Sequence, residues 1–436
     1  MVAGGTHGQR GHSCLIRSLP LTHRESLAAN GSTGTQSLMP KDFVPVARPN
    51  LGQEEVSAAE RALLSGWVTQ GPEVAAFERE FAGFVGAPYA CAVSSGTTAL
   101  HLALLAVGVR PGDEVITVSH SYIATANSIR YCGARPVFVD IDPETFNIDP
   151  RQIEPAIGER TRAILCVHQM GMPCDLKAIL EIARQHTIPV VEDAACAVGS
   201  EIQWQGQWEK IGKPHADVAC FSFHPRKLLT TGDGGMLTTA DRATDRKFRL
   251  WRQHGMSLPD TVRHSSPEVV FESYPELGFN YRLTDIQAAI GREQLKRIPE
   301  AIARRRQLAA GYRDLLGDIP GLVLPTEPDW ARTNWQSFCV RLPANTDQRH
   351  VMQKMLDEGI ATRRGIMCAH LEPAYQDPTT WRCAQVGCKP AAGCPNLAES
   401  ERAQREGVIL PLFSQMTEEQ LSQVASALRG VLRKQG

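Results

Sequence analysis

The chain has 436 residues, of which 42% are hydrophobic and 21% are charged, and its formal net charge is -1. This composition is typical of a globular protein, and the balanced charge does not indicate a nucleic-acid or membrane-surface partner. No apolar run approaches the roughly 18–20 residues that a membrane-spanning helix needs. We therefore expect a protein that binds neither nucleic acid nor membranes.

The 12 cysteines favour a cytoplasmic protein, because several of them lie inside apolar segments. A secreted scaffold instead uses cysteines as a disulfide framework in a short, loop-rich chain. Cys383, Cys388 and Cys394 form a looser cluster, but a zinc site would need tighter ligand pairs and a fourth ligand. We predict surface-loop thiols there and no metal site.

Residues 1–40 differ in composition from the rest of the chain. They are rich in Gly, Ser, Thr and His, and Glu25 is their one acidic residue. They lack the apolar centre of a secretory signal. We predict a disordered extension, or a misassigned start codon with Met39 as the true first residue; a transit peptide is the alternative.

Helices and strands alternate from about residue 41 onward. Pro72 opens a stretch with apolar residues at helical spacing, and Gly83 and Gly86 mark its end. Short β-rich runs then alternate with helical patterns, which predicts an α/β fold with a mostly parallel sheet covered on both faces. The expected strands lie at 114–119, 135–142, 162–169, 188–195 and 216–223, and two of the expected helices lie at 98–108 and 175–186.

The alternation of short strands and helices ends after about residue 295. A long Arg-rich helical stretch covers 294–316, a region with Pro and aromatic residues follows, and a helix over 417–434 closes the chain. We predict a large domain over 41–295 and a smaller C-terminal α+β domain over 296–436.

Several polar segments follow expected strands or open expected helices, and ligands of such folds bind beyond the carboxyl ends of the strands. Ser94 to Thr98 form a Gly/Ser/Thr turn at a helix start, which suits a phosphate but also suits an ordinary helix cap. Asp193 ends an apolar strand, where a carboxylate can contact a ligand or cap a helix. Lys227 lies between a strand and the glycine-rich turn 232–235, although most lysines are solvated surface residues.

A fourth segment, residues 278–285, precedes another expected helix. Thr284 or Asp285 can cap that helix. Asn280 and Arg282 can contact an anion.

A phosphate turn, an acid after a strand and then a lysine after a strand, in that order, resemble the arrangement of fold type I pyridoxal-phosphate (PLP) enzymes. Within that group the chain resembles the DegT/DnrJ/StrS sugar aminotransferases from about Val44 to the C-terminus. The matching segments are GWVTQGP, SSGTTALHLALL, GDEVITVSHSYIATANSI, VFVDIDPETFNID, EDAACAVGS, FSFHPRKLLTTGDGG, LGFNYRLTDIQAAIG and TRRGIMCAHLEPAY.

The resemblance implies a role for each matching residue. Lys227 would form the Schiff base with PLP, and Asp193 would pair with its pyridine nitrogen. Asn280 would reach the phosphate from the neighbouring subunit of a homodimer that shares its active sites. The remaining implied cofactor contacts are Gly96, Thr97, Thr98 and Ser222 at the phosphate and Tyr122 stacked on the ring.

Cys196 departs from the family pattern, because many relatives carry Gln or His where a side chain contacts the phenolic oxygen of PLP. A thiol is a weaker hydrogen-bonding group. Either Cys196 packs without a specific role or it tunes the cofactor.

The substrate contacts implied by the resemblance lie in two loops. The candidates for a nucleotide-sugar are Trp67, Thr69, Gln70, Arg282, Arg363, Arg364 and His370. The adjacent arginines suit a diphosphate through charge-assisted hydrogen bonds, and a solvated basic turn is the alternative.

The implied activity is transfer of an amino group from an amino acid, glutamate in most of the family, to a nucleotide-linked keto-deoxysugar. Lys227 would serve as the base that moves the proton. Two alternatives stay open, a PLP-dependent sugar dehydratase and a PLP-binding sensor without turnover. The known dehydratases carry His in place of the lysine, which argues against the first.

Overall fold

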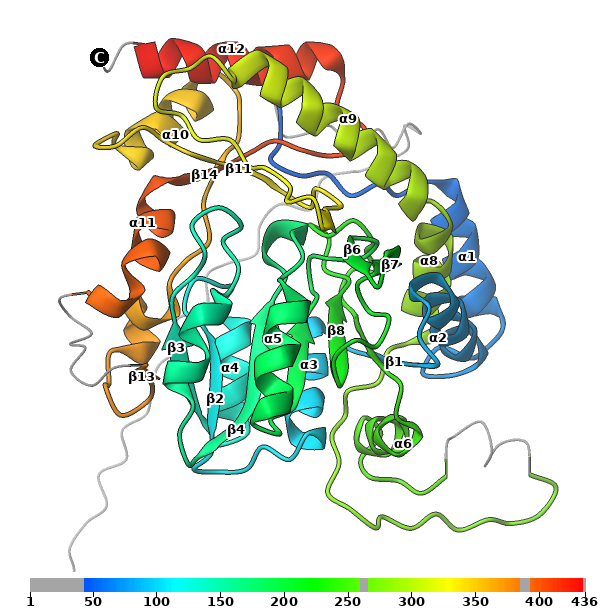
Figure 1. The fold of residues 1–436 in the computed structure, drawn as a ribbon. Helices are drawn as coiled ribbons and strands as arrows, with labels where there is room; N and C mark the ends of the chain where they lie inside the picture. The colour runs from blue at the N-terminus through cyan, green and yellow to red at the C-terminus, as the bar shows by residue number, and fades with distance from the viewer. Residues whose placement is uncertain (1–42, 259–265, 385–392, 434–436) are drawn as a thin grey trace, which may run out of the picture. The chain divides into compact units, whose positions relative to one another are not determined.

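The computed structural model describes residues 43–258, 266–384 and 393–433. An eight-stranded sheet forms its centre, with the strand order β1-β9-β8-β5-β4-β2-β3-β13 (Figure 1). Every neighbouring pair is parallel except those that involve β9, which runs antiparallel to β1 and β8. The predicted α/β fold with a mostly parallel sheet is confirmed. Its strands are β1 (Tyr89–Val93), β2 (Glu114–Val118), β3 (Arg135–Val139), β4 (Thr161–Val167), β5 (Val190–Asp193), β8 (Val218–Ser222), β9 (Gly235–Thr239) and β13 (Arg382–Cys383).

Successive strand residues point to opposite faces of the sheet, and apolar residues point to both. Helices therefore cover both faces. Val190 belongs to the core on the face of α2, α5 and α8, while Val191 belongs to the core on the face of α3, α4 and α6. The helices are α1 (Gln53–Leu64), α2 (Pro72–Val85), α3 (Gly96–Ala106), α4 (Ala124–Tyr131), α5 (Leu176–Gln185), α6 (Arg242–Trp251) and α8 (Asp285–Lys296).

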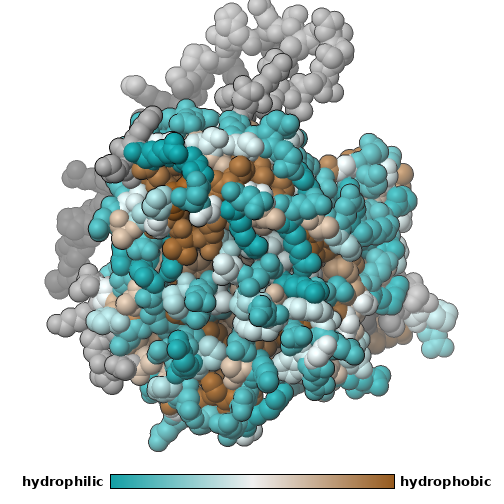
Figure 2. All heavy atoms as spheres, turned by 45° about the horizontal axis from the view of Figure 1, so that its top comes forward, coloured by the Kyte–Doolittle hydropathy of each residue, from teal (hydrophilic) through white to brown (hydrophobic). Residues whose placement is uncertain are grey.

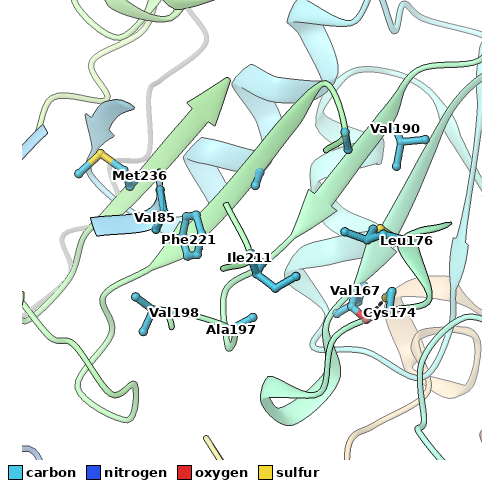
Figure 3. Close-up of a cluster of buried hydrophobic side chains, with 14 of the residues drawn as sticks. Val85, Val167, Cys174, Leu176, Val190, Ala197, Val198, Ile211, Phe221 and Met236 are labelled. Atoms are coloured by element: carbon cyan, nitrogen blue, oxygen red, sulfur yellow. Dashed lines mark hydrogen bonds between the residues drawn. The ribbon is translucent and has the colours of Figure 1, made fainter. Parts of the chain in front are cut away.

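The core on the α2 and α5 face is tightly packed (Figure 3). Phe221 of β8 lies there beside Val85 and Ile211, and Cys174 donates its thiol hydrogen bond to the carbonyl of Val167 at 3.0 Å. This core therefore packs α2 and α5 against one face of the sheet.

The C-terminal part builds a second core around a three-stranded sheet with the order β11-β14-β12. In Figure 1, α9 and α12 lie side by side above it. The elements of this part are α9 (Ile298–Leu316), β11 (Phe338–Arg341), α10 (Gln348–Asp357), β12 (Arg363–Arg364), α11 (Ala398–Glu406), β14 (Gly407–Leu410) and α12 (Glu418–Arg433). A third sheet has the order β10-β6-β7, with β6 (Glu201–Trp204), β7 (Gln207–Lys210) and β10 (Ala331–Arg332).

The helical stretch predicted over 294–316 is two helices rather than one. α8 ends at Lys296 and α9 begins at Ile298. Pro299 explains the break, because proline lacks the N–H that would donate to the Leu295 carbonyl of α8 and its ring would clash with that carbonyl; at the start of α9 neither effect matters.

Each of the two predicted domains contributes a segment to the other. The predicted boundary at residue 295 stays a prediction. Val44 packs in the C-terminal core, where its N–H donates to the Gly359 carbonyl and its carbonyl accepts from Ala361, both at 2.9 Å. In the other direction, β13 joins the edge of the large sheet. The predicted extension over 1–40 lies outside the described residues.

The prediction of surface-loop thiols is wrong for Cys383 and Cys394, because both side chains are buried and Cys394 is disulfide-bonded. Cys388 lies outside the described residues. Among the residues that the structure describes, no group of His, Cys, Asp and Glu is arranged to hold a metal ion.

Figure 2 turns the α9, α10 and α12 side of the molecule forward and shows mostly hydrophilic side chains with hydrophobic ones between them. In the described part of the chain, no helix has the length and apolar character needed to cross a bilayer.

Candidate active site

Lys227 and Cys196 meet at the edge of the sheet where the parallel strands end. Lys227 follows β8 and Cys196 follows β5, and the two strands are neighbours. The Lys227 Nζ donates to the Cys196 Sγ at 2.9 Å, and both residues are half-buried. The site therefore presents a primary amine that a thiol holds in place.

Asp193 is a buried carboxylate in the same crevice, at the end of β5. It accepts hydrogen bonds from the Thr125 hydroxyl at 2.7 Å and from the Ala195 N–H at 3.2 Å. Burial raises the pKa of Asp193, although both hydrogen bonds and the positive charge of Lys227 oppose that rise. A cation placed against this carboxylate would relieve the cost of burying it.

The predicted phosphate turn forms the start of α3. Ser95 caps the helix, since its hydroxyl accepts from the Thr98 N–H at 3.1 Å while Thr98 Oγ1 accepts from the Ser95 N–H at 3.0 Å. The N–H groups of Gly96 and Thr97 lie in the first turn, where they have no acceptor within the helix. They remain available to an anion, which the helix dipole also attracts.

Gly96 allows this helix start to approach Ser222, the last residue of β8. A Cβ atom at position 96 would lie 2.8 Å from the Ser222 Cβ, closer than side chains tolerate. The close approach brings the Ser222 hydroxyl next to the free N–H groups of α3. Gly96, Thr97, Thr98 and Ser222 therefore border one cradle.

Three predicted contacts lie on exposed or half-buried loops. Tyr122 follows β2 with 59% of its side chain exposed. Asn280 is exposed, and its backbone pairs with Gln253. Arg282 is half-buried beside the start of α8. Their roles toward a cofactor or substrate stay predictions.

Hydrogen bonds attach the early loop with Trp67, Thr69 and Gln70 to the start of α8 and to Gln253, which follows α6. The Thr69 carbonyl accepts from the Asp285 N–H at 3.0 Å, and Gln70 Nε2 donates to Gln253 Oε1 at 3.2 Å. Thr284 caps α8, whereas the Asp285 carboxylate instead caps α2. The substrate role of this loop stays a prediction.

His370 requires a correction. Its side chain is fully buried, with Nδ1 2.6 Å from Ser119 Oγ and Nε2 3.2 Å from Glu401 Oε1. Both ring nitrogens are therefore occupied, and the predicted contact between His370 and a substrate does not fit this position.

Arg363 and Arg364 form the exposed strand β12, and the Arg364 guanidinium pairs with Glu372 at 3.1 Å. Their predicted contact with a diphosphate stays a prediction.

Thr125 is a site residue that the sequence did not reveal. It lies in α4. Its hydroxyl donates to the Asp193 carboxylate and also lies 2.7 Å from the Ser121 hydroxyl. Threonine occurs in many helices, and the chain separates Thr125 from Asp193 by 68 residues. No periodicity or spacing signals such a contact.

The residues present fit PLP on three observations of this structure. A buried carboxylate suits a protonated pyridine nitrogen, an amine beside it suits the aldehyde, and free N–H groups at a helix start suit the phosphate. Lys227, Asp193 and the cradle around Gly96 all border the same end of the sheet.

Comparison with known proteins identifies the family. Residues 49–429 match the DegT/DnrJ/EryC1/StrS aminotransferase family. The chain is 39% identical over 395 residues to GDP-perosamine synthase of Caulobacter vibrioides, covering 89% of this chain and 98% of that protein. It is 38% identical over 395 residues to the spore coat polysaccharide biosynthesis protein SpsC of Bacillus subtilis, covering 90% and 97%.

A solved structure gives the same result. DesV of S. venezuelae superposes with a TM-score of 0.78 at 34% identity, covering 89% of this chain and 98% of DesV. The chain is a PLP-dependent aminotransferase that belongs to the DegT/DnrJ/EryC1/StrS family.

Proposed function

We propose that this aminotransferase moves an amino group from an amino acid to a nucleotide-linked keto-deoxysugar, and that the amino-sugar product serves polysaccharide biosynthesis. The proposal rests mainly on the contact between Lys227 Nζ and Cys196 Sγ beside the buried Asp193. The similarity to GDP-perosamine synthase and to SpsC supports the sugar and the polysaccharide. Glutamate is the first donor to test.

Lys227 and Asp193 divide the chemistry of the reaction between them. Bound PLP supplies an electron sink for the negative charge that develops when the donor loses its α-proton. Hydrogen bonds from Thr125 and the Ala195 N–H favour the charged form of Asp193, which would keep a proton on the ring nitrogen. Once its amine is free, Lys227 takes that α-proton as a general base. Cys196 steadies the amine between these steps.

The other predicted contacts keep their roles in this proposal. Tyr122 stacks on the ring, and the cradle of Gly96, Thr97, Thr98 and Ser222 holds the phosphate. The substrate contacts are Trp67, Thr69, Gln70, Arg282, Arg363 and Arg364.

We further propose a homodimer in which Asn280 reaches the phosphate site of the partner subunit. Exposed apolar side chains in the chain segment that precedes Asn280 support this arrangement. Val269, Phe271 and Leu277 are 85%, 88% and 87% exposed, and a second copy of the chain would bury them. A cytoplasmic location is supported by eight free cysteines of the described residues, Cys91, Cys132, Cys166, Cys174, Cys196, Cys220, Cys339 and Cys368, while the disulfide of Cys394 is an observation against it.

The test is to incubate the protein with PLP, glutamate and a panel of nucleotide-linked keto-deoxysugars. We expect an amino-sugar and oxoglutarate in equal amounts, and we expect Lys227→Ala to lose both turnover and the visible absorption band of the bound cofactor. Normal turnover in Lys227→Ala would overturn the proposal. Loss of a sugar hydroxyl with ammonia release would identify a dehydratase, and cofactor binding without turnover on any sugar would identify a sensor.

A further inference from the structure

The main chain around Lys227 is held by one side chain from far along the sequence. The N–H of Leu228 donates to Gln336 Oε1 at 3.0 Å, and Gln336 Nε2 donates to the carbonyl of Arg226 at 2.6 Å. These two peptide groups flank Lys227 on either side. Gln336 is 8% exposed, so water competes little for either hydrogen bond.

The same turn also holds the segment of Cys196. Asn334 Nδ2 donates to the carbonyls of Cys196 at 2.8 Å and Val198 at 2.9 Å. Asn334 Oδ1 in turn accepts from the Gln336 N–H at 2.8 Å. Both partners of the amine–thiol contact are therefore fixed to a single stretch, residues 334–336.

A buried arginine fixes this turn. Trp335 has a φ of 52°, an unfavourable left-handed conformation for a bulky side chain. Arg305 of α9 stabilises it by donating through Nη1 to the carbonyls of Trp335 at 2.9 Å and Gln336 at 3.1 Å. Burial lowers the pKa of Arg305 to about 10. A guanidinium that is costly to bury thus serves to hold two carbonyl groups in place.

We propose that Gln336 is a positioning residue for Lys227, which sets where the lysine amine stands relative to the cofactor. This inference rests on the proposed role of Lys227. Proton transfer by a lysine depends on the distance and direction of its amine, and a displacement of about 1 Å can slow a reaction about 100-fold. Without Gln336, the backbone beside Lys227 would lose a donor and an acceptor together.

The test compares Gln336→Leu with a matched control, Gln348→Leu. Gln348 also donates through Nε2 to backbone carbonyls, those of Gln404 at 2.9 Å and Gly407 at 2.7 Å, but it contacts neither Lys227 nor its neighbours. Both variants remove two side-chain hydrogen bonds to the backbone. The measurements are Tm, kcat and KM in the full reaction, and the pH midpoint of the visible band of the bound cofactor.

We expect both variants to melt at a lower temperature, but only Gln336→Leu to lose kcat, by roughly 10- to 100-fold with KM little changed. Its visible band should also shift its pH midpoint. Gln336→Glu keeps the acceptor for Leu228 and loses the donor to Arg226, so it should give an intermediate loss. If Gln336→Leu does not fold, the same comparison is made with Gln336→Glu.

Normal kcat and an unchanged band in a folded Gln336 variant would overturn the positioning role. An equal fall of kcat in Gln348→Leu would do the same, because the loss would then reflect general destabilisation. If wild type shows the visible band and Lys227→Ala lacks it, the proposed function stands whichever result the Gln336 variants give. The two failures are therefore distinguishable.

Discussion

Thr125 and Asp193 are joined by a buried hydrogen bond of 2.7 Å between hydroxyl and carboxylate. The Thr125 hydroxyl is 2.7 Å from the Ser121 hydroxyl as well, so a short chain of hydroxyl groups ends on the carboxylate. Burial raises the pKa of Asp193, and this hydrogen bond lowers it again. Thr125 therefore helps to keep Asp193 charged for a protonated ring nitrogen.

Thr125→Val should weaken cofactor binding, because it removes a hydrogen bond to a charged group at nearly constant volume. Such a bond contributes about 1.5–3 kcal/mol, which corresponds to roughly 10- to 100-fold in the Kd for PLP. The loss of PLP affinity in Thr125→Val should grow as pH falls. Without this hydrogen bond the pKa of Asp193 is higher in the variant, so its carboxylate is protonated at a higher pH than in wild type. The measurement is spectrophotometric titration of the apoenzyme with PLP at several pH values. Thr125→Ser, which keeps the hydroxyl, should bind nearly as wild type, and equal affinity in all three proteins would contradict this account.

Alkylation of Cys196 should inactivate the enzyme, because the thiol lies 2.9 Å from the amine of Lys227. Cys196 is half-buried, whereas Cys91, Cys132, Cys166, Cys174, Cys220, Cys339 and Cys368 are buried and should react more slowly. We expect iodoacetamide to abolish activity and bound PLP to slow the loss. The measurement is residual activity against time, with Cys196→Ala as the control for every other cysteine. Equally rapid inactivation of Cys196→Ala would show that another thiol is responsible.

The sequence predicts those parts of the site that follow from strand ends. Asp193 ends one apolar β-rich run and Lys227 follows another after a short turn, and parallel strands bring their carboxyl ends to one edge. Family resemblance adds their roles. The hairpin of β6 and β7 was missed, although Gln205 and Gly206 have φ angles of 50° and 82°, and Gly is typical of such two-residue turns.

Contacts between side chains and distant backbone groups leave no such pattern. Gln336 lies 108 residues from Leu228, and its two hydrogen bonds depend on the turn that Arg305 holds. His370 was misplaced for a related reason, since polarity alone does not distinguish a histidine at a ligand from one that pairs with Ser119 and Glu401. Only the fold determines which polar groups are buried together.

Asp285→Ala should destabilise α2 and the loop before it. The carboxylate accepts from the N–H groups of Gly71, Glu73 and Val74 at 2.8, 3.1 and 3.0 Å, and so it caps a helix whose own cap position is glycine. We expect a loss of about 2 kcal/mol in the free energy of unfolding, the upper end for a helix cap. Urea denaturation measures this loss.

The control for Asp285→Ala is Asp241→Ala, which removes an exposed cap of α6. It should cost about 1 kcal/mol and leave KM for the sugar unchanged. Asp285→Ala should raise that KM if the loop of Trp67 and Thr69 binds substrate. An unchanged KM in a destabilised Asp285→Ala protein would argue against the proposed contact of this loop with the substrate.

His120 should make the protein less stable in mild acid. Its ring is buried against Phe146, neither ring nitrogen has a hydrogen-bond partner among the described residues, and burial lowers the pKa of His120 to about 3. The unfolded chain binds this proton near pH 6.5, whereas the folded protein binds it only near pH 3. Stability is therefore complete above pH 6.5 and falls as the pH drops toward 3, with about 2 kcal/mol lost by pH 5.

His120→Leu removes this titration, and so the variant should lose about 2 kcal/mol less than wild type between pH 7 and pH 5. The free energy of unfolding from urea curves at both pH values gives the comparison. His350→Leu, at an exposed histidine of α10, should follow wild type. Identical pH dependence in His120→Leu and wild type would mean that His120 accepts its proton in the folded protein as readily as in the unfolded chain.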